Sequence, residues 1–185
     1  KEYGNYIPGS HIVRSAASVS VMLTGTKRDI KDPDAWKKEI RVFSFDPQTG
    51  LFEAGEGREP GDEIRWSKWL EDGCGYSLQL LQPGKYLLSG IPFYVLDPSV
   101  ACHTALLEEL DAAQDKADAK TQLTKGTNLY KWLQKRVKAK VPEETAEICR
   151  DPVNALLTGF AAPEAYPQLL RLVMSTAGIR TVLNR

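Results

Sequence analysis

The amino-acid sequence predicts an α+β protein, with an N-terminal antiparallel β-sandwich or barrel-like half followed by a C-terminal helical half of about four helices. Before Asp97-Pro98 the chain consists of short segments rich in β-branched and aromatic residues, separated by Gly and Pro turns. After that dipeptide, apolar residues recur every three or four positions, as on amphipathic helices. We therefore expect a β-rich sandwich-like domain over residues 1–97 and a helical region over 98–185, packed on the sheet because the link between them is short.

The composition is that of a folded globular chain. The 185 residues suffice for one sizeable core, and 42% of them are hydrophobic while 26% are charged. Lysine and arginine number 24, as do aspartate and glutamate, so there is no global positive excess that would attract nucleic acid. No segment approaches the ~18–20 apolar residues of a membrane-spanning helix, and we expect a soluble protein.

The predicted strands begin with residues 17–24, ASVSVMLT, where apolar and other residues alternate with the two-residue period of a half-buried strand. Residues 39–45, EIRVFSF, are β-branched and aromatic, and DPQTG at 46–50 is a turn sequence. The following LFEAGE, 51–56, is the predicted partner strand. This arrangement predicts a first hairpin.

A second hairpin is predicted further along the chain. YSLQLL at 76–81 and KYLLSG at 85–90 flank Pro83-Gly84, a pair typical of a type II turn. EIRWSKWL at 63–70 is a further strand. Its Trp66 and Trp69 are three residues apart and would point to opposite faces of a straight strand, so that only one is expected to be exposed as a contact residue, unless a bulge intervenes.

The helical half is predicted from its apolar stripes and caps. Leu106, Leu110, Ala113 and Ala117 recur at helical spacing along the first helix. Caps are expected further on: Thr127 or Asn128 before a basic helix, Asp151 before Pro152, and Gly178 after the last helix.

Thr26-Lys27-Arg28-Asp29 resembles the [NT]-K-x-D motif with which GTPases read guanine. Such proteins also need the phosphate-binding sequence G-x-x-x-x-G-K-[ST], which does not occur in this chain. The motif would also stand near the end of an alternating α/β domain, not at the start of a β-rich half. We therefore interpret residues 25–38 as a charged loop that meets another protein.

Few residues are suited to catalysis. The only histidines are His11 and His103, and His103 follows Cys102, so these neighbouring side chains point in different directions. We assign both histidines structural roles, and a hydrolase with a Cys or Ser nucleophile is the alternative. The acidic groups at 59–63 and 108–111 are interpreted as a polar loop and a solvated helix face rather than as paired catalytic carboxylates.

The cysteines are Cys74, Cys102 and Cys149. Their spacing is not that of a zinc site, with or without His103, so neither metal nor cofactor is expected. In an exported protein we expect a Cys74–Cys102 disulfide, whereas in the cytoplasm all three would be reduced.

The most distinctive segment is residues 124–141, TKGTNLYKWLQKRVKAKV, which carries six lysines and arginines and no acid. On a helix, Leu129, Leu133, Val137 and Val141 form one apolar stripe flanked by these cations. A basic amphipathic helix over 128–141 can bind an anionic membrane, a partner groove or nucleic acid. The simpler interpretation is a helix that buries its stripe in its own domain, with acids nearby balancing its basic face.

These observations favour a non-catalytic protein-binding accessory or structural component. The first alternative is a binder of anionic surfaces through 128–141, and the second is the Cys- or Ser-dependent hydrolase. Residues 78–90 resemble the last hairpin of exported sandwich domains such as prealbumin-like envelope lipoproteins, which implies a bacterial envelope, periplasmic or secreted location rather than a cytoplasmic one. The residues that we assign to the binding surface are Lys27, Arg28, Trp36, Trp69, Lys131, Trp132, Lys135, Arg136 and Lys138.

Overall fold

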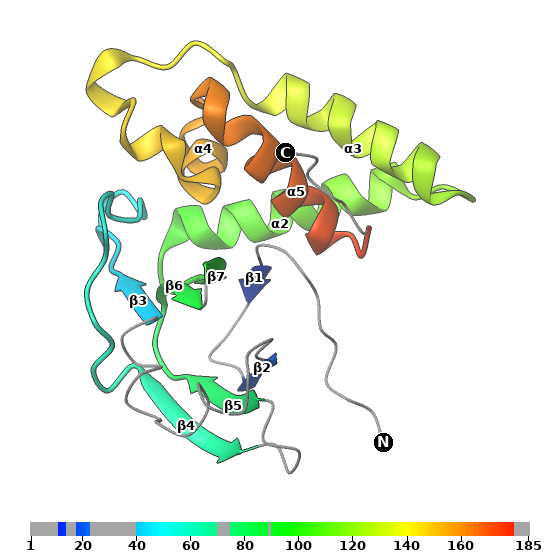
Figure 1. Ribbon diagram of the computed structural model, residues 1–185. Helices are drawn as coiled ribbons and strands as arrows, with labels where there is room; N and C mark the ends of the chain where they lie inside the picture. The colour runs from blue at the N-terminus through cyan, green and yellow to red at the C-terminus, as the bar shows by residue number, and fades with distance from the viewer. Residues whose placement is uncertain (1–10, 14–17, 23–39, 70–74, 89, 180–185) are drawn as a thin grey trace.

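A computed structural model of the protein describes residues 11–13, 18–22, 40–69, 75–88 and 90–179 (Figure 1). Within these residues, four α-helices lie over one small β-sheet, and a second small sheet lies on its other side (Figure 1). The protein is thus mixed α+β, with its described helices in the C-terminal half, as predicted. The sheets do not close into a barrel or form a clear sandwich, so that part of the prediction is wrong.

The upper sheet, next to the helices, has the strand order β1 (His11–Val13), β7 (Ile91–Val95), β6 (Gly84–Leu88) and β3 (Ile40–Phe43). The lower sheet has the order β2 (Ser18–Met22), β5 (Gly75–Leu80) and β4 (Ile64–Trp69). All paired strands are antiparallel except β1 and β7, which are parallel. The strand expected over 17–24 is present as β2, and Leu23 lies outside the described residues.

The second predicted hairpin is not formed. β5 pairs with β2 and β4, whereas β6 pairs with β3 and β7, so the segments on either side of Pro83-Gly84 belong to different sheets. Their apolar residues pack face to face between the sheets instead of pairing along one edge. The first predicted hairpin forms only next to its turn, where the amides of Asp46 and Glu53 donate to the carbonyls of Leu51 and Ser44, each at 3.0 Å, and Phe45 bridges Phe52. The resemblance of 78–90 to a terminal hairpin therefore has no counterpart in this structure.

The turn at 46–50 does form as predicted. The amide of Gly50 donates to the carbonyl of Asp46 at 2.7 Å, and the Asp46 carboxylate accepts from the amide of Gln48 at 2.8 Å. Gly50 has φ of +71°, a conformation that glycine adopts without strain.

The helices are α2 (Ala101–Ala117), α3 (Gln122–Arg136), α4 (Pro152–Thr158) and α5 (Tyr166–Thr176), and short 3₁₀ turns stand at Glu143–Thr145, Ile148–Arg150 and Pro163–Ala165. The predicted apolar stripe of α2 is buried. As expected, Asp151 caps the N-terminus of α4, and Gly178 follows the C-terminus of α5 with a positive φ. The cap of α3 is Thr121, whose hydroxyl accepts from the amide of Thr124, so Thr127 and Asn128 lie inside the helix rather than before it.

Two cores lie on the two faces of the upper sheet. Along β7, Tyr94 belongs to the core beneath the helices, while Val95 belongs to the core between the sheets. Phe52, Tyr94 and Leu96 from the first 97 residues share the helical core with Leu106, Leu129 and other helical residues. The two-residue period of the strand thus places the helical half directly on the sheet. The division into two domains at residue 97 stays a prediction.

Candidate functional site

A group of interacting polar side chains joins the upper sheet to the start of α4. Asp151 accepts from the ammonium of Lys85 at 2.7 Å and from the hydroxyl of Tyr94 at 2.9 Å, both at Oδ2. Its Oδ1 accepts from the amides of Val153 and Asn154 at 2.9 and 3.1 Å. With four donors on one carboxylate, Asp151 is a cap and an ion-pair partner rather than a free base.

Asp151 and its partner Lys85 are largely shielded from solvent. The side chains of Lys85 and Asp151 are only 17% and 8% exposed, and the Lys85 ammonium lies 4.4 Å from the centre of the Phe43 ring. Burial, reinforced by the charge of Asp151, raises the pKa of Tyr94 well above its ordinary value. Tyr94 is therefore a neutral hydrogen-bond donor here.

Asn154, one turn into α4, holds the loop that follows the 46–50 turn. Its Oδ1 accepts from the amide of Phe52 at 2.8 Å, and its Nδ2 donates to the Phe52 carbonyl at 2.8 Å and to the Ile148 carbonyl at 3.2 Å. The side-chain amide thus pairs with Phe52 as a neighbouring β-strand would. We call the contacts of Lys85, Tyr94, Asp151 and Asn154 the polar junction.

His103 completes the attachment of this loop from α2. It is fully buried; its Nδ1 accepts from the amide of Asp97 at 3.0 Å, so its Nε2 is the protonated nitrogen and donates to the Gly50 carbonyl at 2.7 Å. Its ring stacks on Phe52 with an angle of 8° between the planes. Both ring nitrogens are occupied by backbone groups, which agrees with a structural role.

The two described cysteines, Cys102 and Cys149, lie in different parts of the structure. Cys102 contacts the Thr49 carbonyl at 3.4 Å, beside the contact of His103 with Gly50 but not paired with the imidazole. Cys102 and Cys149 are free thiols, so the structure does not show the expected Cys74–Cys102 disulfide; Cys74 itself lies outside the described residues. Within the described part of the chain, no group of three or more His, Cys, Asp or Glu side chains could hold a metal ion.

The strand that carries the two tryptophans is not straight. A bulge between Trp66 and Lys68 shifts the register of β4, so the Trp66 backbone pairs with Leu78 and the Trp69 backbone with Tyr76. The prediction of opposite faces applied to a straight strand and excepted a bulge, so the expectation of one exposed tryptophan stays a prediction.

The basic segment divides into a buried side and an exposed side. Leu129 and Leu133 are fully buried and Val137 nearly so, all in the core beneath the helices. The helix ends at Arg136, so the predicted helix over 128–141 is wrong in extent: the Lys138 backbone instead pairs beside Phe160, with its amide donating to the Gly159 carbonyl at 2.9 Å. The apolar stripe is therefore not available to a membrane or a partner groove.

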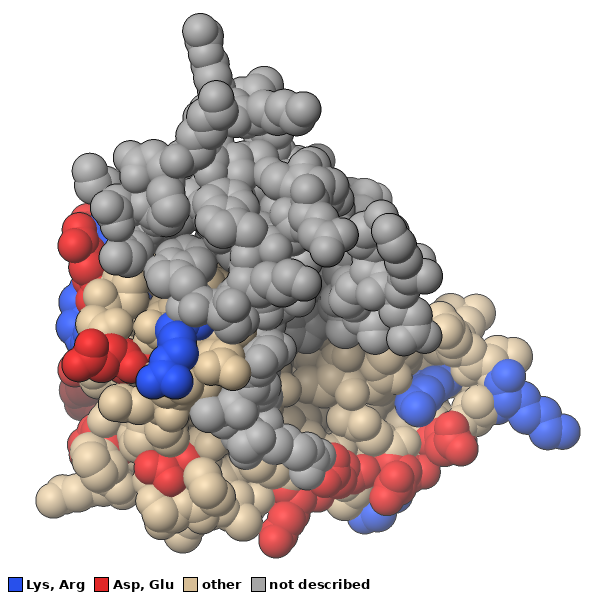
Figure 2. Space-filling view, turned by 90° about the horizontal axis from the view of Figure 1, so that it is seen from below, with Lys and Arg blue, Asp and Glu red and all other residues tan. Residues whose placement is uncertain are grey.

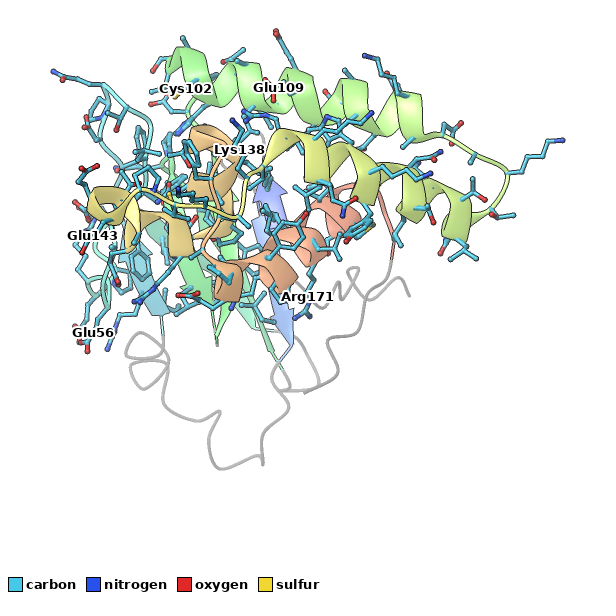
Figure 3. All side chains as sticks on the ribbon, turned by 90° about the horizontal axis from the view of Figure 1, so that it is seen from above. Glu56, Cys102, Glu109, Lys138, Glu143 and Arg171 are labelled. Carbon is cyan, nitrogen blue, oxygen red and sulfur yellow. The ribbon has the colours of Figure 1, made fainter. Side chains whose placement is uncertain are left out.

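The predicted contact residues of this segment have different surroundings. Trp132 is half-buried and packs against the core, and the Arg136 guanidinium is bound to the Glu109 carboxylate of α2 at 2.8 Å. Figure 3 shows α2 and α3 side by side from above, with Glu109 on α2 and Lys138 at the end of α3. Within residues 124–141, the exposed lysines for which the described residues provide no ion pair are Lys131, Lys135, Lys138 and Lys140.

Two exposed apolar residues of α3 were not predicted from the sequence as contact residues. Leu123 is 82% exposed and Tyr130 is 39% exposed. With the helix predicted to begin after Asn128, Leu123 had no helical face to which it could be assigned. Thr121 itself, a residue type favoured at helix N-caps, was the signal that would have placed the cap correctly, because its hydroxyl reaches the amide three residues on.

The remaining predicted positions are not placed by the structure. Lys27, Arg28 and Trp36 lie outside the described residues, and for His11 and Trp69 only the backbone, in β1 and β4, is described.

The described helices include none long and apolar enough to span a bilayer. No family model, curated protein or solved structure matches this chain. Its function has to be argued from its own residues.

Proposed function

We propose that this chain is a non-catalytic protein-binding component, and that its contact surface is the outward side of α3. The observation that carries the proposal is a combination on that side: Lys131 and Lys135, which have no ion pair among the described residues, lie with the exposed apolar residues Leu123 and Tyr130. Exposed apolar side chains beside charged ones are common in protein interfaces, where aromatic residues are enriched.

The opposite side of α3 supports the proposal. Leu129 and Leu133 are fully buried, so the core of the protein fixes the orientation of the helix before any partner arrives. A surface that is ordered in advance loses little conformational entropy on binding. By contrast, the imidazole of His103, the carboxylate of Asp151 and the phenol of Tyr94 are each occupied by hydrogen bonds that stabilise the fold.

A binder of anionic surfaces is the second candidate. Lys138 and Lys140 are exposed beyond the end of α3 and lengthen the row of lysines. Binding of this kind should weaken steeply as salt rises, because it depends on the release of counterions. Titration of a duplex oligonucleotide and of anionic vesicles at several salt concentrations tests it; no binding, or a flat salt dependence, would remove this candidate.

The main proposal is tested by comparing the proteins that copurify with the chain and with two charge-reversed variants. Lys131→Glu with Lys135→Glu changes the proposed surface, whereas Lys116→Glu with Lys120→Glu changes two exposed lysines at the end of α2 and just beyond it. Quantitative mass spectrometry should show the same partners with the wild type and the second variant, and their loss with the first. Equal recovery with all three would refute the proposed surface.

A further inference from the structure

We infer that the partner segment recognised by α3 is acidic and carries apolar side chains, so that it fills a cationic strip and an apolar strip at once. This inference rests on the proposed function and specifies the chemistry of its partner.

The two strips run side by side along the helix. The apolar strip consists of Leu123 and Tyr130, about two helical turns apart; the polar residues Thr127 and Gln134 lie on the same side, and all four are exposed. Lys131 and Lys135 follow Thr127 at spacings of four residues, so they form a neighbouring row, about 100° round the helix from Tyr130 and Gln134. From Leu123 to Gln134 the helix rises by about 16 Å, which is enough for about three helical turns of a partner.

Charge complementarity selects an acidic partner. Among residues 122–141 there are six lysines and arginines and no aspartate or glutamate. Lys125 and Arg136 are in contact with the acids Asp118 and Glu109, which leaves the other four without an ion pair among the described residues. Carboxylates of a partner would supply the charges that the chain itself does not provide there.

The neighbouring helix disfavours a long polyanion or a flat anionic membrane. Glu108, Glu109 and Asp115 of α2 are exposed, and α2 packs directly beside α3. Because charges are screened over ~8 Å at physiological salt, these carboxylates repel any anionic ligand that is wide enough to cover both helices. A single segment lying along α3 meets the lysines with less of this repulsion.

The apolar strip also separates a protein segment from other anions. Leu123 exposes 82% of its surface, and phosphate groups would gain nothing from covering it. The face of the molecule seen from below, away from α3, shows basic and acidic side chains mixed on its described part (Figure 2). The described surface of that face therefore has no comparable all-basic strip.

A random-peptide display library selected against the folded protein tests the inference. Peptides recovered on the wild type should be enriched in Asp and Glu together with Leu, Phe or Trp, relative to the unselected library. Affinity of a recovered peptide should fall about tenfold or more in the Lys131→Glu, Lys135→Glu variant, and severalfold in the Leu123→Ser, Tyr130→Ser variant. The Lys116→Glu, Lys120→Glu variant should bind as the wild type does, and circular dichroism should show all of them folded.

Several results would overturn the inference: no enrichment, enrichment without acidic residues, or equal binding to the charge-reversed variant. Displacement of the peptides by a duplex oligonucleotide or by anionic vesicles at equal charge concentration would overturn it in favour of a general anion surface. If the copurification experiment still shows partners lost with Lys131→Glu and Lys135→Glu, the proposed function stands and only the partner chemistry is wrong.

Discussion

Replacement of Asn154 by alanine should destabilise the protein more than any other single change of a polar side chain in α4. The residue is fully buried and makes three hydrogen bonds, two with Phe52 and one with the Ile148 carbonyl. Phe52 is 102 residues away in the chain, in the β-rich half. The substitution therefore removes polar contacts that join the two halves.

The magnitude follows from what is left behind. Alanine leaves the buried N–H and carbonyl of Phe52 without these partners, whereas the Ile148 carbonyl still accepts from the Asp151 amide, and each unsatisfied group costs about 1–3 kcal/mol. Carbonyls tolerate the loss better than an N–H, so we expect a decrease in the free energy of unfolding of about 3–5 kcal/mol. That is a large part of the ~5–15 kcal/mol by which folded domains are stable.

Urea unfolding followed by far-UV circular dichroism measures this loss as a lower midpoint. Gln134→Ala is a suitable control, because the Gln134 amide makes an exposed hydrogen bond to the Tyr130 hydroxyl and its removal should cost less than about 0.5 kcal/mol. A loss below about 1 kcal/mol for Asn154→Ala would show that the junction does not hold the halves together as argued.

The Asn154→Asp variant tests the direction of the hydrogen bonds. It keeps the acceptor for the Phe52 amide but turns the donor toward two carbonyls into a second oxygen. An ionised carboxylate there is repelled, so the folded protein would hold its pKa above the unfolded value of about 3.9. The variant should therefore be least stable above the folded pKa and should regain stability as the pH falls toward 4. A pH-independent deficit would contradict this reading.

Three further outcomes are expected. Gly126→Ala should raise the free energy of unfolding by about 0.5–1 kcal/mol, measured in urea, because the new methyl would lie in ordinary contact, 3.7 Å from the Met174 sulfur, in a helix interior. Asp151→Ala should cost about 3–5 kcal/mol and Lys85→Met clearly less, because only the former leaves a mostly buried cation unpaired and the cap amides free. The hydrogen-bonded ion pair with the Arg58 guanidinium lowers the pKa of the Glu63 carboxyl, so the contribution of this pair to stability is present above the ordinary value of 4.5 and is lost as pH falls through the lower folded pKa. Glu63→Gln should flatten an acid titration of stability in that range.

The helical half could largely be predicted from sequence because its signals are local. The α2 stripe repeats four times within one element, and the Asp151 and Gly178 caps act on residues within four positions of themselves. Such patterns can be interpreted without knowing which distant residues the helix contacts. The one wrong cap, at Thr127 or Asn128, arose because the helix continues through both residues from Thr121.

Strand pairing could not be predicted in the same way. The alternation of Leu78 with Leu80 and of Tyr86 with Leu88 predicted two strands correctly, but the same alternation suits neighbours in one sheet and partners in stacked sheets. The polar junction was hidden for a similar reason. Nothing near Lys85 or Tyr94 in the sequence indicates that both meet Asp151, 66 and 57 residues further on.

The residues that stabilise the fold differ from those that we propose to bind the partner. The variants at the polar junction and the variants on α3 therefore serve as controls for one another. Changes at the polar junction remove buried contacts and should lower the unfolding midpoint while leaving the outward side of α3 intact in the folded fraction. Lys131 and Lys135 are exposed and without ion pairs among the described residues, so reversing their charges should shift stability by less than about 0.5 kcal/mol while abolishing partner binding. If charge reversal on α3 instead lowered the midpoint as much as Asp151→Ala, those lysines would have to stabilise the fold, and their exposure could no longer be taken as the mark of a contact surface.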